Sequence, residues 1–140
     1  MPVLLAMAAA ARLISAICSA SPTVFQAPAS VLLRCTCTYA DEPVIVDVAP
    51  SADPYHVVAV PVGRRFAFRA VWLKEAGREV LELVAYHATK AGDVPLTQVT
   101  YRAPFPPVAA EAPFGFTGLH RVYEPDLGSE LTFWCAWGAP

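Results

Sequence analysis

Asparagine is absent from this chain of 140 residues, and charged residues make up only 16% of it. Without asparagine the chain has no acceptor for N-linked glycosylation. The formal net charge is -2, and the few arginines and lysines form no basic stripe along the sequence. A phosphate backbone needs such a concentration of positive charge, so we expect no nucleic-acid partner.

Sequence motifs of catalysis are also missing. The chain has no Gly-x-Ser-x-Gly, and its seven glycines are isolated from one another, so neither a nucleophile elbow nor a phosphate-binding loop is predicted. Asp53 and His56 are close in sequence, but Pro54 between them indicates a turn in which Asp53 caps the backbone or is solvated. We therefore predict that the protein is not an enzyme and needs no cofactor.

The first twenty residues are almost wholly apolar, with Arg12 as their only charge. A charge near the middle of a bilayer costs roughly 2.5 to 3.5 kcal/mol on insertion scales, so no stable membrane span is expected. We predict a secretory signal peptide over residues 1–20, with cleavage at its end or after Ala29. The alternative is an N-terminal helix packed on the domain. Residues 21–30 are then a linker and residues 31–140 the domain of an exported protein, either periplasmic, in the cell envelope, or secreted.

Short apolar runs separated by clusters of Pro, Gly and Asp fill the rest of the chain. Such spacing is typical of an all-β fold, and we predict a single antiparallel β-sandwich of about seven to eight strands with immunoglobulin-like architecture. No family is assigned, because Trp72 is too far from Cys35 and Phe133 replaces the tyrosine that immunoglobulin domains place two residues before their second cysteine. The expected strands are Val31 to Tyr39, Val44 to Val48, Tyr55 to Val62, Arg65 to Leu73, Val80 to His87, Val94 to Arg102, Phe116 to Tyr123 and Leu131 to Trp137.

Two hairpins are predicted within this pattern. The first turns at Glu75-Ala76-Gly77-Arg78, where Gly77 supplies a left-handed backbone conformation and Lys74 faces Glu79 across the closing pair. The second turns at Glu124-Pro125-Asp126-Leu127-Gly128, where Pro125 presets a turn angle.

The cysteines occupy strand positions with a common phase. Side chains alternate between the two faces of a strand, so Cys35 and Cys37 share the face of Leu33, and Cys135 shares that of Phe133. We predict that Cys135 forms a disulfide with Cys35 or Cys37, closing a loop of about 100 residues that chain-entropy models credit with about 4.7 kcal/mol. Once the leader is removed, one cysteine is left over, either buried and idle or paired between chains.

The same sulfur atoms suggest an alternative. Cys35 and Cys37 with a histidine, His56 or else His87 or His120, offer the sulfur and imidazole ligands that copper and zinc prefer. The spacing Cys-Thr-Cys differs from that of zinc knuckles, so the main prediction contains no metal.

Candidate binding residues come from a proline-rich loop, a late strand and two arginines. Phe105 and Phe114 lie in the loop and either anchor it as a crossover between sheets or form an apolar handle for a partner. Trp134, opposite in phase to Cys135, is the best candidate for an exposed aromatic. Arg65 and Arg69 share a strand face, where they either attract an anionic partner or protect the sheet from edge pairing.

These observations predict an exported, non-catalytic β-sandwich that binds a protein or has a structural role in the cell envelope or outside the cell. The first alternative is a copper- or zinc-binding envelope protein that uses Cys35, Cys37 and a histidine. The second is a small hydrolase or carbohydrate-binding enzyme with an unrecognised site. The ligand and the oligomeric state do not follow from the sequence.

Overall fold

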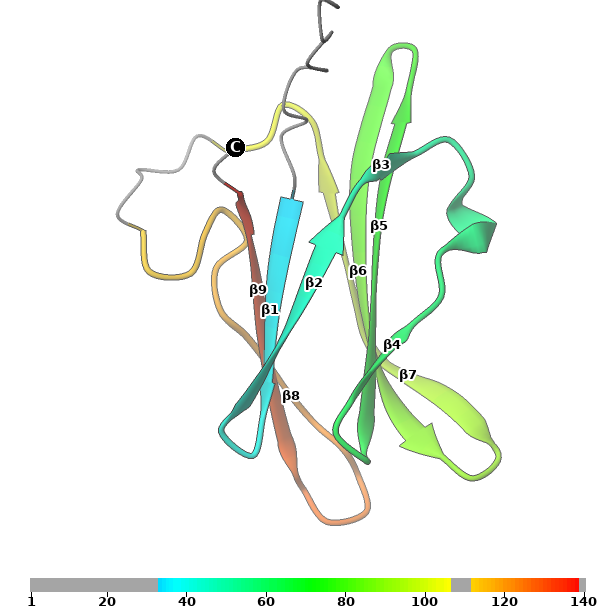
Figure 1. Cartoon of the computed structure of the whole chain (residues 1–140), viewed down its shortest axis with the longest axis vertical. Coiled ribbons are helices and arrows are strands. Elements are labelled where there is room, and N and C mark those ends of the chain that lie inside the picture. Colours follow the sequence, from blue (N-terminus) through cyan, green and yellow to red (C-terminus); the bar gives the residue numbers. More distant parts are fainter. Residues whose placement is uncertain (1–32, 107–111, 139–140) are drawn as a thin grey trace, which may run out of the picture.

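The computed structural model describes residues 33–106 and 112–138 of the chain. Within these ranges the chain forms two sheets that pack face to face (Figure 1). This arrangement confirms the predicted all-β sandwich. The predicted signal peptide and linker, residues 1–20 and 21–30, lie outside the described residues.

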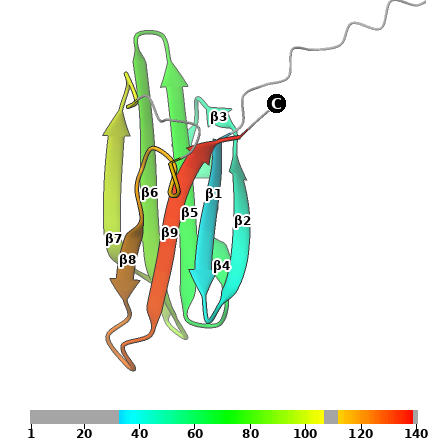
Figure 2. The ribbon, with the colours of Figure 1, turned by 90° about the vertical axis from the view of Figure 1, so that its left-hand side faces the viewer.

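Sheet A contains both ends of the described chain. From edge to edge its strands are β2 (Glu42–Val48), β1 (Leu33–Tyr39), β9 (Glu130–Trp137) and β8 (His120–Tyr123). All neighbours in this sheet are antiparallel. Figure 2 shows sheet A in front, with β9 lying between β1 and β8.

Sheet B contains the middle of the chain. Its strands are β3 (Pro50–Ser51), β5 (Phe66–Glu75), β6 (Arg78–Thr89) and β7 (Gly92–Arg102), with β4 (Val60–Val62) also paired to β5. One short pair departs from the antiparallel arrangement, because β3 pairs with β5 in parallel. The chain makes this pair by passing from sheet A to sheet B directly after β2, so that β3 runs in the same direction as β5.

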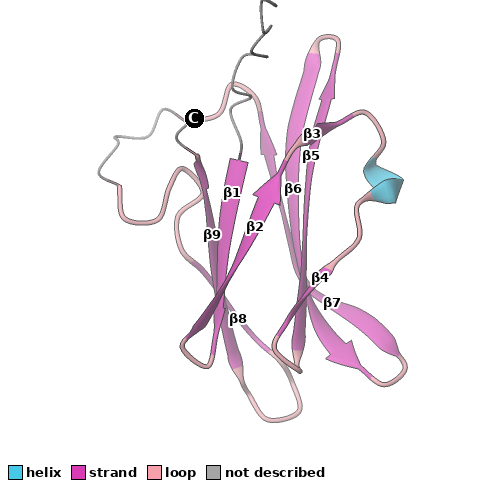
Figure 3. Cartoon of the chain, viewed as in Figure 1, coloured by secondary structure: helices cyan, strands magenta, loops and turns pink. Residues whose placement is uncertain are grey.

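Two predicted strands are shorter than expected. The segment Tyr55 to Val62 begins as a 3-10 helix, Pro54–His56, because the Asp53 side chain accepts a hydrogen bond from the Tyr55 backbone N–H and Pro54 starts the turn (Figure 3). The cap predicted at Asp53 is thereby confirmed. The segment Phe116 to Tyr123 turns first and pairs only from His120 onward.

Both predicted hairpins are confirmed. Gly77 has φ +77° in the turn between β5 and β6, and Lys74 lies opposite Glu79 in the register. The Glu79 carboxylate nevertheless accepts a hydrogen bond from Trp72 Nε1 at 2.8 Å, while Lys74 Nζ lies 5.7 Å from the centre of the Trp72 ring. The expected charge pair is therefore replaced by contacts that both residues make with a core tryptophan.

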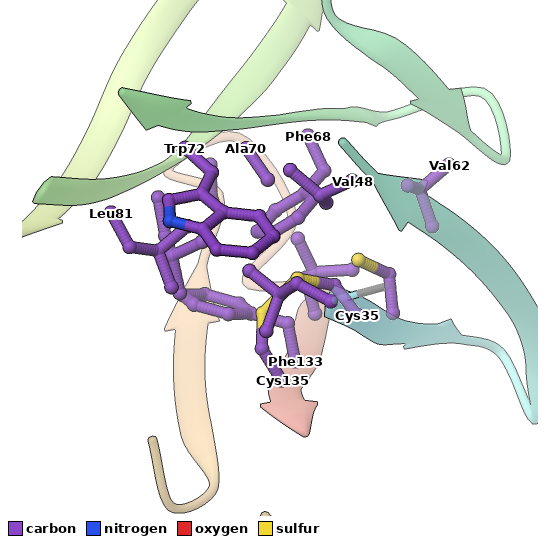
Figure 4. Packing of buried hydrophobic residues seen from close by; sticks show 14 of the residues in the cluster. Cys35, Val48, Val62, Phe68, Ala70, Trp72, Leu81, Phe133 and Cys135 are labelled. Atoms are coloured by element: carbon purple, nitrogen blue, oxygen red, sulfur yellow. A yellow bond between two sulfur atoms is a disulfide. The ribbon is translucent and has the colours of Figure 1, made fainter. Parts of the chain in front are cut away.

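The core lies between the sheets and is rich in aromatic side chains. Phe68 of sheet B and Phe133 of sheet A are both fully buried, with ring centres 5.1 Å apart. Trp72 and Trp137 form a second pair across the sandwich at 5.2 Å. Figure 4 shows Cys35 and Cys135 among these side chains, on the inner face of sheet A. The alternation of the sequence therefore predicted the inward face of both sheets correctly.

Candidate functional site

The strand register decides which cysteines pair. Cys35 lies directly opposite Cys135 in the β1–β9 ladder, with Cα atoms 4.0 Å apart, and the two form a disulfide. Cys37 lies opposite Phe133 instead. The bond joins neighbouring strands of one sheet across a sequence separation of 100 residues. It thus fastens the first described strand to the last.

Cys37 is the free cysteine of the described residues, and it is fully buried. Burial raises the pKa of its thiol to about 12, so the nucleophilic thiolate is not formed at neutral pH. The alternative ligand set of Cys35, Cys37 and His56 is not brought together. Cys35 is bonded to Cys135, and the exposed His56 places Nδ1 2.7 Å from the Asp53 carboxylate.

The candidate aromatic residues separate into a structural one and a surface pair. Phe105 packs against Phe116 and Trp137, with ring centres 5.5 and 5.6 Å away. It therefore anchors the connection from β7 in sheet B to β8 in sheet A, which is the crossover role expected for this loop. Phe114 instead contacts Trp134 edge to face at 6.3 Å and keeps 39% of its surface exposed.

Gly115 allows this surface pair to form. Its φ of +57° is a left-handed conformation, and a Cβ at this position would lie 2.1 Å from the Cys135 backbone oxygen. Only glycine lets the loop pass this close to β9. The close passage brings Phe114 onto the outer face of sheet A, beside Trp134.

A row of side chains continues across the outer face of sheet A from Trp134. Thr36 of β1 lies opposite Trp134 on one side and opposite Ile45 of β2 on the other. Ile45 is 52% exposed, and both Trp134 and Thr36 are half-buried. We call the surface formed by Thr36, Ile45, Phe114 and Trp134 the Trp134 face.

Paired charges border the Trp134 face on the same side of the sheet. At one end, Arg34 Nε lies 2.7 Å from Asp47, and its hydrogen bond lowers the pKa of the Asp47 carboxyl. At the other end, the Glu130 carboxylate receives hydrogen bonds from Arg121 and the Tyr123 hydroxyl. The hydrogen bond to Glu130 raises the pKa of Tyr123. The surface thus has an apolar centre and a polar border.

Arg65 and Arg69 form no common basic patch. Arg69 Nη2 lies 3.3 Å from Glu82 on the neighbouring strand. Arg65, just before β5, donates from Nη1 to Glu124 at 3.0 Å. Both guanidinium groups are therefore neutralised by carboxylates, which agrees with a protective or structural role for these arginines.

Glu124, which the sequence pattern placed only in a turn, is a buried carboxylate at the end of the sandwich. Its Oε1 and Oε2 atoms accept backbone N–H bonds from Asp126, Leu127 and Ser129 in addition to the Arg65 bond. Burial alone would raise the pKa of Glu124, but the hydrogen bonds from the turn outweigh it and lower the pKa to about 2. Glu124 therefore organises the β8–β9 turn and ties it to sheet B. A glutamate at the start of Pro-Asp-Leu-Gly was the available signal for this role.

His87 of β6 faces the same carboxylate. The side chain is 8% exposed, and Nε2 lies 3.8 Å from Glu124 Oε2 and 3.5 Å from Asp126 Oδ2. The third histidine, His120, has its hydrogen-bond partner in another part of the sandwich. Its Nε2 lies 2.8 Å from the Tyr101 hydroxyl, and its ring stacks on Phe133.

An apolar cleft opens at the other edge of the sandwich, between β2 and the β3–β4 connection. Its volume is about 370 Å³, and its lining includes Val46, Val48, Val58 and Phe68. Among the residues that line it, Asp47 is the one with an ionisable side chain, and Asp47 is paired with Arg34. The residues that line this cleft therefore include no pair of ionisable side chains that could act as general acid and general base.

Comparison of the chain with models of protein families, with curated proteins and with solved structures gave no match. Over the part of the chain that the structure describes, no helix has the length and apolar character needed to span a bilayer.

Proposed function

We propose that this protein is an exported, non-catalytic β-sandwich that binds a partner protein through the Trp134 face. The observation that carries the proposal is the contact between Phe114 and Trp134, which come from the crossover loop and β9 and meet on the outside of sheet A. Ile45, 52% exposed, extends the apolar surface across the sheet. These side chains are available to a partner without any change in the fold.

The composition of the Trp134 face supports a protein partner. Protein interfaces combine an apolar, aromatic centre with a polar, solvent-accessible rim. Tryptophan is among the residues that contribute most binding energy at the centre of such a surface. The ion pairs Arg34–Asp47 and Arg121–Glu130 fit the rim, since each charge already has a partner and needs none from the other protein.

A non-catalytic role is supported by the bonding of the buried carboxylate. Glu124 has its two oxygens engaged by four donors, three of them backbone N–H groups of its own turn. These bonds lower the pKa of Glu124 to about 2, far from the pKa near the operating pH that an efficient general base needs. Export is supported by the Cys35–Cys135 disulfide, because such bonds persist in oxidising compartments.

The binding proposal is tested with a photoreactive amino acid at Thr36 in the full chain, in the organism that produces it. The expected product is a crosslink to one partner, which is then purified. With that partner, Trp134→Ala is expected to weaken binding by about 30-fold, the effect of a hot-spot residue worth about 2 kcal/mol.

Tyr55→Ala is the matched control, because Tyr55 is an aromatic residue 92% exposed and placed on the β3–β4 connection. It should leave the affinity unchanged. Equal losses for the two variants, or a crosslink that contains only a second copy of this chain, would contradict binding through the Trp134 face to a different protein. Circular dichroism checks that each variant keeps the fold.

Export is tested separately by intact mass spectrometry of the protein recovered outside the cytoplasm. The expected mass lacks residues 1–20 and is lower by two hydrogens than that of the reduced chain. An intact Met1 together with reduced thiols would remove the exported-protein proposal.

A further inference from the structure

Three potential metal ligands converge at the end of the sandwich where the β8–β9 turn meets sheet B. His87 comes from β6, and Glu124 and Asp126 come from the turn. One donor atom from each side chain lies within 4.8 Å of the other two. These residues are distant in sequence from Cys35 and Cys37, so this cluster is unrelated to the sulfur set considered from the sequence.

His87 is a buried polar side chain without a hydrogen bond to any described residue. The side chain is 8% exposed, and Nε2 points toward both carboxylates. The separations of 3.5 Å from Asp126 Oδ2 and 3.8 Å from Glu124 Oε2 are longer than hydrogen bonds. Neither carboxylate oxygen is close enough to accept a hydrogen bond from Nε2, and because His87 lines an open pocket, this nitrogen is accessible to a ligand from solvent.

The same separations suit a shared metal ion. In a tetrahedral site with metal–ligand distances of about 2.0 to 2.1 Å, neighbouring donor atoms are about 3.3 to 3.4 Å apart. The observed 3.5 and 3.8 Å from His87 Nε2 differ from this spacing by a few tenths of an ångström, and the Glu124–Asp126 pair lies within 4.8 Å, so a rotation of the exposed Asp126 side chain would complete the arrangement. One imidazole with two carboxylates is a nitrogen and oxygen donor set that suits Zn²⁺ and related divalent ions.

The surroundings of Glu124 orient it for this role. Arg65 Nη1 bonds Oε1, whereas Oε2 is the atom on the His87 side. The backbone N–H of Asp126 donates to Oε2 at 2.7 Å, and that of Leu127 is shared between Oε1 and Oε2 at 3.2 Å each, so the turn fixes the direction of the carboxylate. Hydrogen bonds of this kind hold metal-binding carboxylates in position.

Access from solvent exists on the Asp126 side. The Asp126 side chain is 68% exposed. An open pocket of about 420 Å³, lined by Arg64, Thr89 and Lys90 among others, includes His87 and Asp126 in its wall. An ion therefore reaches the cluster without unfolding of the sandwich, and water completes its coordination from the pocket.

We propose that His87, Glu124 and Asp126 form a binding site for one divalent transition-metal ion of the Zn²⁺ class. The site is independent of the Trp134 face, which lies on the outer side of sheet A. The ion joins the β8–β9 turn of sheet A to the end of β6 in sheet B. Binding to the folded chain alone then stabilises the sandwich.

The test is titration of the disulfide-bonded full chain with Zn²⁺ by calorimetry at neutral pH, starting from metal-free protein. One ion per chain is expected. Asp126→Asn should weaken binding at least about tenfold, the lower bound seen when a metal site loses one supporting group. Because Asp126 is exposed, this substitution preserves the fold even if His87→Gln does not.

His56→Gln is the matched control. His56 is the other histidine close to a carboxylate, with Nδ1 2.7 Å from Asp53, and it lies on the β3–β4 connection. It should leave Zn²⁺ affinity unchanged. Zn²⁺ should also raise the melting temperature of the wild type and of His56→Gln, but not that of Asp126→Asn.

Co²⁺ identifies the donor atoms. Nitrogen and oxygen ligation gives weak visible bands without the intense near-ultraviolet band of a thiolate, and Cys37→Ala should leave the spectrum unchanged. A thiolate band, loss of binding in His56→Gln, or affinity retained in both Asp126→Asn and His87→Gln would overturn the proposal. So would the absence of any Zn²⁺ binding to the wild type.

Discussion

The two sheets of the sandwich are assembled from the chain in different ways. Sheet B is centred on β5, β6 and β7, which follow one another in sequence and are joined by short turns. Sheet A depends on the pairing of β1 with β9, whose cysteines are 100 residues apart. Distant pairing requires a large loss of chain entropy, whereas a local hairpin does not. The disulfide therefore lies in the sheet that chain connectivity supports least.

Removal of the disulfide is expected to have the largest effect on the difference in stability between the two sheets. Cys35→Ala with Cys135→Ala should lower the free energy of unfolding by up to about 4.7 kcal/mol, the chain-entropy value for a loop of about 100 residues. Denaturant titration measures this loss. Hydrogen exchange should show faster exchange in β1 and β9 than in β5 and β6, because sheet A loses its covalent link.

Cys37→Ala is the control for that experiment, since it removes a buried sulfur from the same strand face without opening the loop. Its effect should be smaller than that of the double substitution. Equal acceleration of exchange in both sheets would show that the disulfide supports the whole sandwich and not sheet A in particular.

A substitution in the shared core tests whether the sheets unfold together. Phe133→Ala in sheet A and Phe68→Ala in sheet B should each lower the free energy of unfolding by about 3 to 5 kcal/mol, because both rings are fully buried. The rings touch, so a double-mutant cycle should give a coupling of about 0.5 to 1.5 kcal/mol.

Unfolding is expected in a single transition for each core variant, measured by fluorescence and by far-ultraviolet circular dichroism. If Phe133→Ala left a separate transition belonging to sheet B, that hairpin sheet would be an autonomous unit. The two sheets would then differ in stability as well as in how the chain connects their strands.

Acidification is expected to have the smallest effect on stability. It acts at the end of the sandwich where Glu124, in the β8–β9 turn of sheet A, accepts a hydrogen bond from Arg65 next to sheet B. The pKa of Glu124 is lowered from 4.5 to about 2 in the folded chain, so the folded state binds fewer protons than the unfolded state between these values. The stabilisation is fully present above pH 4.5 and is lost as the pH falls toward 2.

Urea midpoints between pH 6 and pH 2.5 measure this loss. In Glu124→Gln the midpoint should be lower at pH 6 and depend less on pH over that range. Glu82→Gln is the control, because Glu82 pairs with Arg69 within sheet B and does not join the two sheets. A wild-type midpoint that stays constant down to pH 2.5 would contradict the role assigned to Glu124.

Local signals in the sequence predicted much of the fold. Alternation placed Cys35, Cys37 and Cys135 on the core face, and all three are fully buried. Gly77 and the Pro-Asp-Leu-Gly sequence marked both hairpins. The prediction that a strand begins at Tyr55 was wrong. An apolar run after a proline resembles a strand even where an aspartate caps a 3-10 helix.

The candidate sites were less predictable. Phe105 and Phe114 have similar sequence surroundings, yet one packs into the core and the other reaches the surface. The difference depends on where the crossover loop meets β9, which no local pattern records. Glu124 and His87 are 37 residues apart in sequence, as their numbers show, and meet only because the two sheets stack.

Patterns that repeat over a few residues were enough to predict the class of fold, the inward face of the strands and a disulfide from Cys135 to the first strand. The folded arrangement of the chain selects Cys35 as the partner, since Cys35 and Cys37 have the same phase and differ only in register against β9. It also decided that Arg65, Glu124 and His87 form one cluster. Register and sheet stacking are set by the packing of distant segments, and a local pattern does not contain them.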